Sequence, residues 1–246
     1  MDHFAPTSDA MQAFLLGPID FEACLALQQR LVYEASGAGD RAITLLVCEH
    51  PPLITVGRSG SRTHLHISSD ELISQQIEVR WLNRGGGCIA HLPGQLAIYP
   101  IVPLERCAWT VGEYLGRLQA GLMNTLAELA IPATGRDGWP GVWGRTGQLA
   151  AIGAAVKNWT TYHGAFLNVA PAMRLVRRVV SDPADGEPMS SLMVERQGSV
   201  KMTAVRSGIV RHFAEAFGAA RYHIHTSHPL LARSPEKTRE RAARAH

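Results

Sequence analysis

This 246-residue chain lacks long apolar runs, a leader-like start and a dominant charge, and each absence excludes a class of protein. No apolar stretch approaches the roughly 20 residues that cross a bilayer, so no membrane-spanning segment is expected. The first residues lack a basic stretch followed by an apolar core, so no secretory signal is expected. A net charge of only +3 does not favour a nucleic-acid partner.

Cysteine is also scarce, with four residues and no CxxC pair. This usage is typical of reduced thiols in a cytoplasmic protein. His223, His225 and His228 lie close together, but no Cys or carboxylate accompanies them at a metal-ligand spacing, so no metal and no cofactor are predicted. The apolar content of 46% is ample for the core of an α/β domain.

Local patterns predict three long helices. Asp20 is a candidate cap for a helix over 21–35, and Ser199 for one that ends near 217. Thr110 and Glu113 form a capping-box pattern ahead of leucines at helical spacing over 111–130. Apolar or alternating runs predict strands at 42–48, 53–56, 77–82, 141–144, 148–156 and 164–169.

Residues 84–95 read Arg-Gly-Gly-Gly-Cys-Ile-Ala-His-Leu-Pro-Gly-Gln and carry the strongest signal in the chain. Three consecutive glycines allow close approach to the backbone. The segments 88–90 and 95–99 read as two strands joined by a turn. This pattern predicts a hairpin with Arg84 at its base, a backbone cradle, and His91 at its tip. Such an element suits a ligand with an apolar body and one polar end, although a lone glycine run more often marks a bulge or a tight crossing.

The same segment resembles the substrate loop of lipoyl(octanoyl) transferases, in the superfamily of lipoate and biotin protein ligases. Three further segments match the family in the same order: Glu49-His50-Pro51-Pro52 through Gly57-Arg58-Ser59-Gly60, then Ala151-Ile152-Gly153, then His163-Gly164-Ala165-Phe166-Leu167-Asn168. The resemblance covers roughly residues 15–215, which is far too extended for a chance motif. It implies a single α/β domain over 15–217, in which a mixed, mostly antiparallel sheet wraps an acyl pocket and helices pack outside. Residues 218–246 form a C-terminal extension, expected to be flexible from 234.

The resemblance breaks at two positions. Family members carry a Lys where this chain has Gln148. They also carry a nucleophilic Cys ahead of a segment that is here Gly186-Glu187-Pro188-Met189-Ser190-Ser191-Leu192, and an ungapped count places Asp182 at that Cys position. Gln148 cannot stabilise a thiolate by charge, and Asp182 is no soft nucleophile. A general-base role for Asp182 toward an incoming amine is one alternative, and a loop Asp before a Pro is the other.

The resemblance assigns three positions to catalysis: His91, Gln148 and Asp182. The predicted substrate-binding residues are Arg58, Arg84, Gly85, Gly86, Gly87, Cys88, His91, Ala151, Ile152, Gly153, Gly164, Ala165 and Phe166. Cys88 is a candidate for a relocated nucleophile, although its apolar neighbours favour an inert packed thiol.

The resemblance implies an octanoyl or lipoyl group as ligand, with acyl carrier protein and lipoyl-domain proteins as partners of a monomer. We therefore expect a divergent acyltransferase of protein lipoylation in which the target lysine attacks a bound thioester directly. One alternative is a non-catalytic binder of the acyl group or its carrier domain. Another is an ATP-dependent lipoate or biotin ligase. Gln148 argues against this alternative, because ligases of the superfamily use a Lys at this position near the phosphate.

Overall fold

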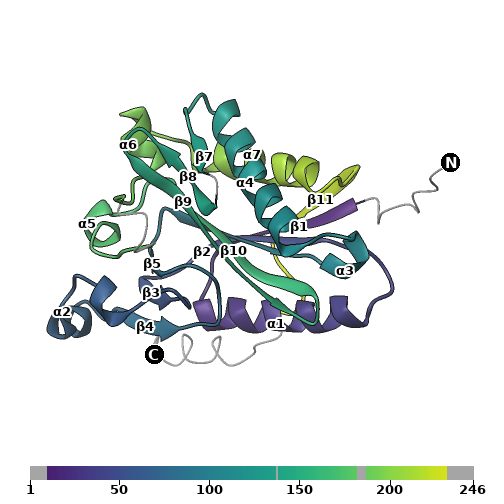
Figure 1. Ribbon diagram of the computed structural model, residues 1–246, viewed down its shortest axis with the longest axis horizontal. Coiled ribbons are helices and arrows are strands. Elements are labelled where there is room, and N and C mark those ends of the chain that lie inside the picture. The colour runs from purple at the N-terminus through teal and green to yellow at the C-terminus, as the bar shows by residue number, and fades with distance from the viewer. Residues whose placement is uncertain (1–9, 137, 182–186, 232–246) are drawn as a thin grey trace, which may run out of the picture.

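The computed structural model describes residues 10–136, 138–181 and 187–231 (Figure 1). Its main element is an eight-stranded sheet in the order β11-β1-β2-β6-β10-β9-β8-β7. The strands are β1 (Ala10–Pro18), β2 (Thr44–Glu49), β6 (Gln95–Ile101), β7 (Thr134–Arg136), β8 (Trp139–Gly144), β9 (Gly147–Lys157), β10 (Thr160–Asn168) and β11 (Arg221–His225). The pairs β11–β1 and β1–β2 are parallel, and the other five pairs are antiparallel. The predicted mixed, mostly antiparallel α/β fold is confirmed.

A second, three-stranded sheet lies beside the first (Figure 1). It has the order β4-β3-β5, with β3 (Leu53–Val56), β4 (Glu78–Trp81) and β5 (Cys88–His91). The predicted hairpin over 88–99 is therefore wrong. β5 pairs with β3, whereas β6 lies in the large sheet between β2 and β10. The turn at 92–94 passes the chain between the sheets, because β6 is buried along its whole length and takes partners on both sides.

Helices cover both faces of the large sheet. The helix α1 (Phe21–Gly37) lies on one face, and α4 (Val111–Glu128) and α7 (Met202–Ala216) lie on the other (Figure 1). Strand alternation separates the two cores: Leu45 and Val47 of β2 pack toward α4 and α7, and Leu46 packs toward α1. The shorter helices are η1 (Arg62–His64), α2 (Ser69–Ser74), α3 (Leu104–Cys107), α5 (Met173–Val176) and α6 (Leu192–Arg196).

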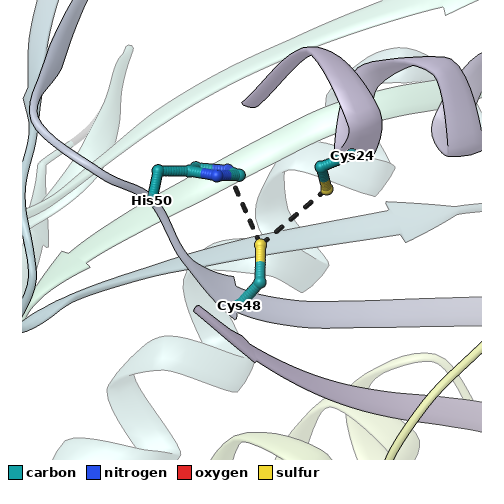
Figure 2. A group of neighbouring side chains, drawn as sticks. All are labelled: Cys24, Cys48 and His50. Atoms are coloured by element: carbon teal, nitrogen blue, oxygen red, sulfur yellow. Dashed lines mark hydrogen bonds between the residues drawn. The ribbon is translucent and has the colours of Figure 1, made fainter. Parts of the chain in front are cut away.

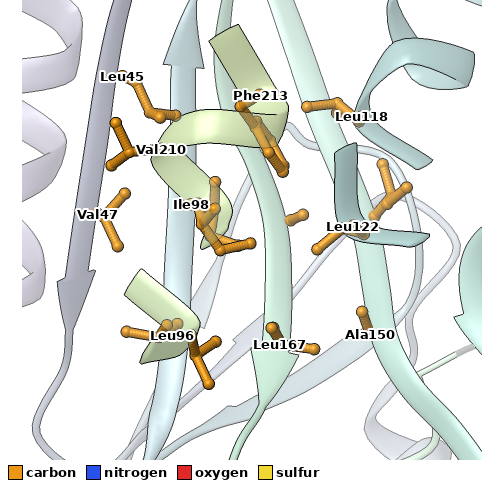
Figure 3. Packing of buried hydrophobic residues seen from close by; sticks show 14 of the residues in the cluster. Leu45, Val47, Leu96, Ile98, Leu118, Leu122, Ala150, Leu167, Val210 and Phe213 are labelled. Atoms are coloured by element: carbon orange, nitrogen blue, oxygen red, sulfur yellow. The ribbon is translucent and has the colours of Figure 1, made fainter. Parts of the chain in front are cut away.

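Helix starts follow the sequence signals in two of three cases. Asp20 accepts a hydrogen bond from the Ala23 backbone N–H (3.0 Å), as predicted. The capping box of α4 is complete, with Thr110 and Glu113 each bonded to the other's backbone N–H. The predicted cap at Ser199 is wrong: α7 begins after Lys201, which makes no side-chain capping bond. Packing positions this helix, because its buried residues meet α4 (Figure 3).

The large sheet extends past both predicted domain limits. β1 begins at Ala10, and β11, which lies in the expected C-terminal extension, pairs in parallel with β1. The segment expected to be flexible, from 234 onward, lies outside the described residues. Within the described part of the chain, no helix is both long and apolar enough to span a bilayer.

The contact between α4 and α7 generates a paired stability prediction. A Cβ at Gly121 of α4 would lie 2.7 Å from Cδ2 of Phe213, whereas a Cβ at Gly116, on the same helix, would meet nothing within 4 Å. Gly121→Ala should lower the free energy of unfolding by about 1–3 kcal/mol through overpacking. Gly116→Ala should raise it by about 0.5–1 kcal/mol through helix propensity. Urea denaturation midpoints, compared at equal m-values, measure both changes. A change in the free energy of unfolding of the same sign in both variants would contradict this packing.

Candidate functional site

Arg84 lies buried where the two sheets meet, with 1% of its surface exposed. Its Nη2 donates to the Thr55 carbonyl (3.0 Å) and hydroxyl (2.7 Å), and its Nη1 donates to the Gly85 carbonyl (2.9 Å). The guanidinium also stands over the Phe166 ring, 5.4 Å from its centroid. Its Nε–H has no hydrogen-bond partner, and no carboxylate of the described residues pairs with it. Burial lowers the pKa of Arg84 to about 10, so the group remains a cation at neutral pH.

The glycine run after Arg84 joins the two sheets through its backbone. Gly57 N–H donates to the Gly87 carbonyl (2.9 Å), while Gly87 N–H donates to the Ser181 carbonyl and Gly85 N–H to the Ala154 carbonyl (both 2.8 Å). A Cβ at Gly87 would lie 2.5 Å from the Ser181 oxygen, so a side chain there has no room. The run is thus a tight crossing, and Gly86, with φ of +75°, adopts a backbone conformation that favours glycine.

A small cavity lies against this crossing. Its volume is about 10 Å³, and its walls include Gly86, Gly87, Gln148 and Ser181 together with residues 151–153. Two other predicted binding residues lie on β10. Phe166 does not line the cavity but contacts the Arg84 guanidinium at its wall. Gly164 packs against the neighbouring strand, where a Cβ would lie 2.3 Å from the Ile98 carbonyl oxygen. Arg58 is exposed, and its Nη2 lies 4.0 Å from the position of a Cβ at Gly85. Strand β10 therefore contributes through Phe166 rather than through its glycine.

Gln148 is buried at the cavity and bonds on both sides of residues 182–186. Its Oε1 accepts from the Ser181 hydroxyl (2.5 Å), its N–H donates to the Pro188 carbonyl (2.9 Å), and its carbonyl accepts from Ser190 N–H (2.7 Å). Asp182, which the resemblance predicts at the family's Cys position, lies outside the described residues. Gln148 thus anchors both ends of the segment in which that position occurs.

His91 is buried beside Arg84, not at an exposed tip. Its Nε2 lies 2.9 Å from the Thr55 hydroxyl oxygen, and its Nδ1 has no partner. Because Arg84 can only donate, the Thr55 oxygen accepts from it, and we assign the single Thr55 proton to His91 Nε2. The neutral ring then carries its proton on Nδ1. Burial, followed by the nearby His50 and Arg84, holds the pKa of His91 well below its usual value.

Cys88 lies on the opposite side of β5 from the cavity. Its thiol lies 3.6 Å from the Ser61 carbonyl oxygen and packs in the small core around β3, whereas its neighbour Ile89 lines the cavity. Burial raises the pKa of this thiol, although Arg84 opposes the shift. This geometry is that of a packed thiol, the alternative that its apolar neighbours favoured.

Sequence reasoning missed four buried polar residues around this site: His50, Thr55, Tyr99 and His163. His50 and Thr55 occur within the matched segment from Glu49 to Gly60, so the match to the family was the signal that could have identified them. His163 has φ of +54° inside β10, an uncommon conformation for a residue with a side chain. Its Nδ1 has no partner, and burial, followed by Arg84 and His50, lowers its pKa to about 3.

The neutral histidines make stability depend on pH. The folded protein keeps His163 neutral down to a pKa of about 3, whereas an unfolded His binds a proton near 6.5. Protons are therefore taken up on unfolding between these values, and stability falls as the pH falls below 6.5. For His163 the loss at pH 5 should be about 2 kcal/mol. The lowered pKa values of His50 and His91 add losses of the same sign.

Urea unfolding at pH 7.5, 6.0 and 5.0 measures this dependence. His163→Asn is the matched variant, because Asn tolerates a positive φ and does not titrate. It should reduce the loss of stability between pH 7.5 and 5.0 by about the contribution of one histidine. An unchanged pH dependence in that variant would show that His163 is not the source.

Comparison with known proteins places this site in a family. Residues 20–214 match the model of the lipoyl protein ligase A/B catalytic domain. The chain is 37% identical over 198 residues to the octanoyltransferase of Geotalea uraniireducens, covering 80% of this chain and 89% of that protein. It is 34% identical over 203 residues to the octanoyltransferase of Nitratidesulfovibrio vulgaris, covering 82% and 92%.

Solved structures share the fold at low sequence identity. A crystal structure of lipoate-protein ligase A bound with ATP aligns with a TM-score of 0.71 at 16% identity, covering 91% of each chain. A bipartite lipoate protein ligase from Thermoplasma acidophilum, studied with its E2 lipoyl domain, aligns with a TM-score of 0.69 at 14% identity, covering 91% of this chain and 89% of that one. The extent and identity of the sequence matches decide the assignment: this chain belongs to the lipoyl protein ligase A/B catalytic domain family.

Proposed function

We propose that this protein transfers an octanoyl or lipoyl group to a lysine of a lipoyl domain, without an acyl-cysteine intermediate. The observation that carries the proposal is the buried Arg84 cation, whose Nε–H has no partner, at the wall of a cavity built from the glycine run and residues 151–153. The octanoyltransferase relatives support the acyl group and the lipoyl-domain acceptor. Acyl carrier protein as donor, a monomeric state and a cytoplasmic location stay predictions.

Two buried donors suit a carbonyl oxygen that gains negative charge: Arg84, which lines the cavity, and His91, which lies beside Arg84 but does not line the cavity itself. Arg84 keeps a charged N–H without a partner, and the neutral His91 ring keeps the Nδ1 proton without an acceptor. Both groups lie in a buried environment, where fixed donors stabilise a developing oxyanion more strongly than water does. In our proposal they hold the thioester oxygen, and Phe166 contacts both of them.

The proposed step is a direct aminolysis. The lysine amine attacks the carbonyl carbon, a C–N bond forms, and the C–S bond to the carrier breaks. The leaving thiolate takes up the proton that the amine loses, so no oxidant and no nucleotide is consumed. Gln148 contributes no charge, and its side-chain oxygen already accepts from Ser181. Positioning of the two substrates, together with the oxyanion donors, therefore supplies the rate enhancement.

The size of the cavity sets a condition on binding. A volume of about 10 Å³ holds roughly one water molecule, far less than an eight-carbon chain. Ser181 is the last described residue before 182–186, and its carbonyl accepts from Gly87 N–H (2.8 Å). We propose that the acyl chain enters by separating Ser181 from the glycine run. Ligand binding should then break the hydrogen bond from the Gly87 N–H to the Ser181 carbonyl.

Intact-mass measurement tests the reaction. The protein is incubated with octanoyl-carrier protein, with and without a lipoyl domain. We expect an octanoyl gain on the lipoyl domain and none on this protein, because no thiolate lies at the matching family position. The double variant Gln148→Lys with Asp182→Cys should instead gain an adduct that hydroxylamine removes.

Three results would contradict this function. A stable adduct on the wild-type protein would show a covalent route, and its loss in Cys88→Ser would place it on Cys88. No octanoyl gain on either protein, combined with tight acyl binding, would favour the non-catalytic binder. ATP-dependent loading of free lipoate would favour a ligase.

Thermal unfolding tests the cavity assignment separately. A ligand at a hundredfold excess over its dissociation constant stabilises the folded state by about 2.7 kcal/mol, or roughly 5–10 °C in melting temperature. Octanoyl thioester should give such a shift in the wild type. Gly86→Val should abolish this shift, because Gly86 lines the cavity and the valine side chain would fill it. Gly218→Val is the control, because Gly218 has a similar φ (+68°) but does not line this cavity. Equal shifts in both variants would remove the support for this pocket.

A further inference from the structure

A second cluster of reactive side chains lies under α1, outside the cavity described above. It consists of Cys24 on α1, Cys48 on β2 and His50 just beyond β2, all three buried (Figure 2). The two Sγ atoms lie 3.9 Å apart, and Cys48 Sγ lies 3.6 Å from His50 Nε2. One ligand atom from each residue falls within 4.8 Å of the other two. None of the three lines the cavity beside Arg84.

The His50 ring is oriented so that a lone pair faces the thiols. Its Nδ1 lies 2.9 Å from the Ile19 carbonyl, which can only accept, so Nδ1 carries the proton. Nε2 of the neutral ring is then an acceptor, directed at Cys48 Sγ and at the Tyr99 hydroxyl (2.9 Å). A backbone carbonyl that fixes one ring nitrogen, so that the other presents its lone pair to the ligands, is the usual arrangement of a metal-binding His.

Two of the three separations in the cluster agree with a tetrahedral zinc site, and the third, between Cys24 and His50, lies within 4.8 Å. Bonds of ~2.3 Å to sulfur and ~2.05 Å to nitrogen at tetrahedral angles place two sulfurs ~3.8 Å apart, and a sulfur and a nitrogen ~3.6 Å apart. The observed values are 3.9 and 3.6 Å. A disulfide requires a sulfur separation of ~2.05 Å, so oxidation would demand a far larger movement than metal binding.

We propose that Cys24, Cys48 and His50 bind a zinc ion, with the Tyr99 hydroxyl oxygen at the fourth position. Two thiolates and a neutral imidazole balance the charge of Zn²⁺, which makes burial of the complete site tolerable. Binding releases the two thiol protons.

A surface pocket lies near the cluster, with Phe21 between them. Its volume is about 280 Å³, and its lining includes the carboxylates of Asp20, Glu22 and Glu78, which attract cations. Phe21 lines the same pocket and meets His50 edge-on, with ring centroids 5.2 Å apart. Movement of this ring would open the cluster to the pocket. Arg80 pairs with Glu22 and Glu78, so the attraction is partly offset.

The metal would join α1 to the large sheet beneath the candidate site. Cys24 belongs to α1 and Cys48 to β2, while His50 stacks on Tyr99 and stands edge-on to His91. The ion would therefore stabilise the wall on which His91 and Phe166 rest. It takes no part in the acyl transfer proposed above, so the two proposals fail independently.

The test uses the full-length protein stripped by a chelator and then titrated with Zn²⁺. We expect one ion per chain, release of two protons, and a rise in melting temperature with zinc concentration. Co²⁺ in place of Zn²⁺ should give a thiolate-to-metal charge-transfer band. Cys24→Ala and Cys48→Ala should each weaken binding roughly 100-fold or more and remove the band. Cys88→Ala and Cys107→Ala are matched controls that should leave both unchanged.

Circular dichroism of each variant shows whether it is folded, and Cys24→Ser supplies a second variant if the alanine variant unfolds. If both Cys24 variants unfold, the number of zinc ions bound and of protons released by the wild-type protein still tests the proposal. Absence of binding to the stripped wild type overturns the proposal. Binding that persists in Cys24→Ala and Cys48→Ala overturns it too, because other histidines then hold the ion. A Cys24–Cys48 disulfide formed by a mild oxidant, with no zinc binding, would identify a redox pair instead.

Discussion

The buried Arg84 guanidinium contacts both sheets of this protein, the small one through hydrogen bonds to Thr55 and the large one through the Phe166 ring. A cation taken out of water is costly unless its donors find acceptors, and here Thr55 and Gly85 supply three of them. Thr55 belongs to the small sheet, while Phe166, under the guanidinium, belongs to the large one. A lysine lacks the planar fork that reaches these acceptors together. The glycines that follow Arg84 permit the close crossing that this burial requires.

The same cation shapes the chemistry of its neighbours. Burial lowers the pKa of both His91 and His163, and the charge of Arg84 lowers each further. These rings stay neutral at physiological pH and keep one nitrogen each without a partner. The positive charge is therefore concentrated on Arg84, which remains incompletely hydrogen-bonded. Such a site is prepared for an oxygen atom with partial negative charge, and it excludes a second cation.

Scaffold and catalytic group are separable in this family member. The contacts that form the crossing involve Arg84, Thr55, the glycines and Ser181, and none needs a charge at position 148. Gln148 instead fixes Ser181 on one side and Pro188 and Ser190 on the other, by neutral hydrogen bonds. A chain with Gln148 in place of the family's Lys, as the resemblance predicts, can thus keep this crossing intact.

The sequence by itself determined the elements whose signals are local. The capping box of α4, the Asp20 cap of α1 and the strand at 53–56 formed as predicted, because their hydrogen bonds and periodicity involve neighbours along the chain. The family motifs likewise identified Arg84, the glycine run and residues 151–153, which do meet at one cavity. Tertiary structure decided what those residues touch. It separated β5 from β6, because strand partners are chosen by burial of whole faces rather than by the length of a turn. It buried His91 and brought Cys24, Cys48 and His50 together from α1 and the end of β2, a convergence that no spacing in the sequence encodes.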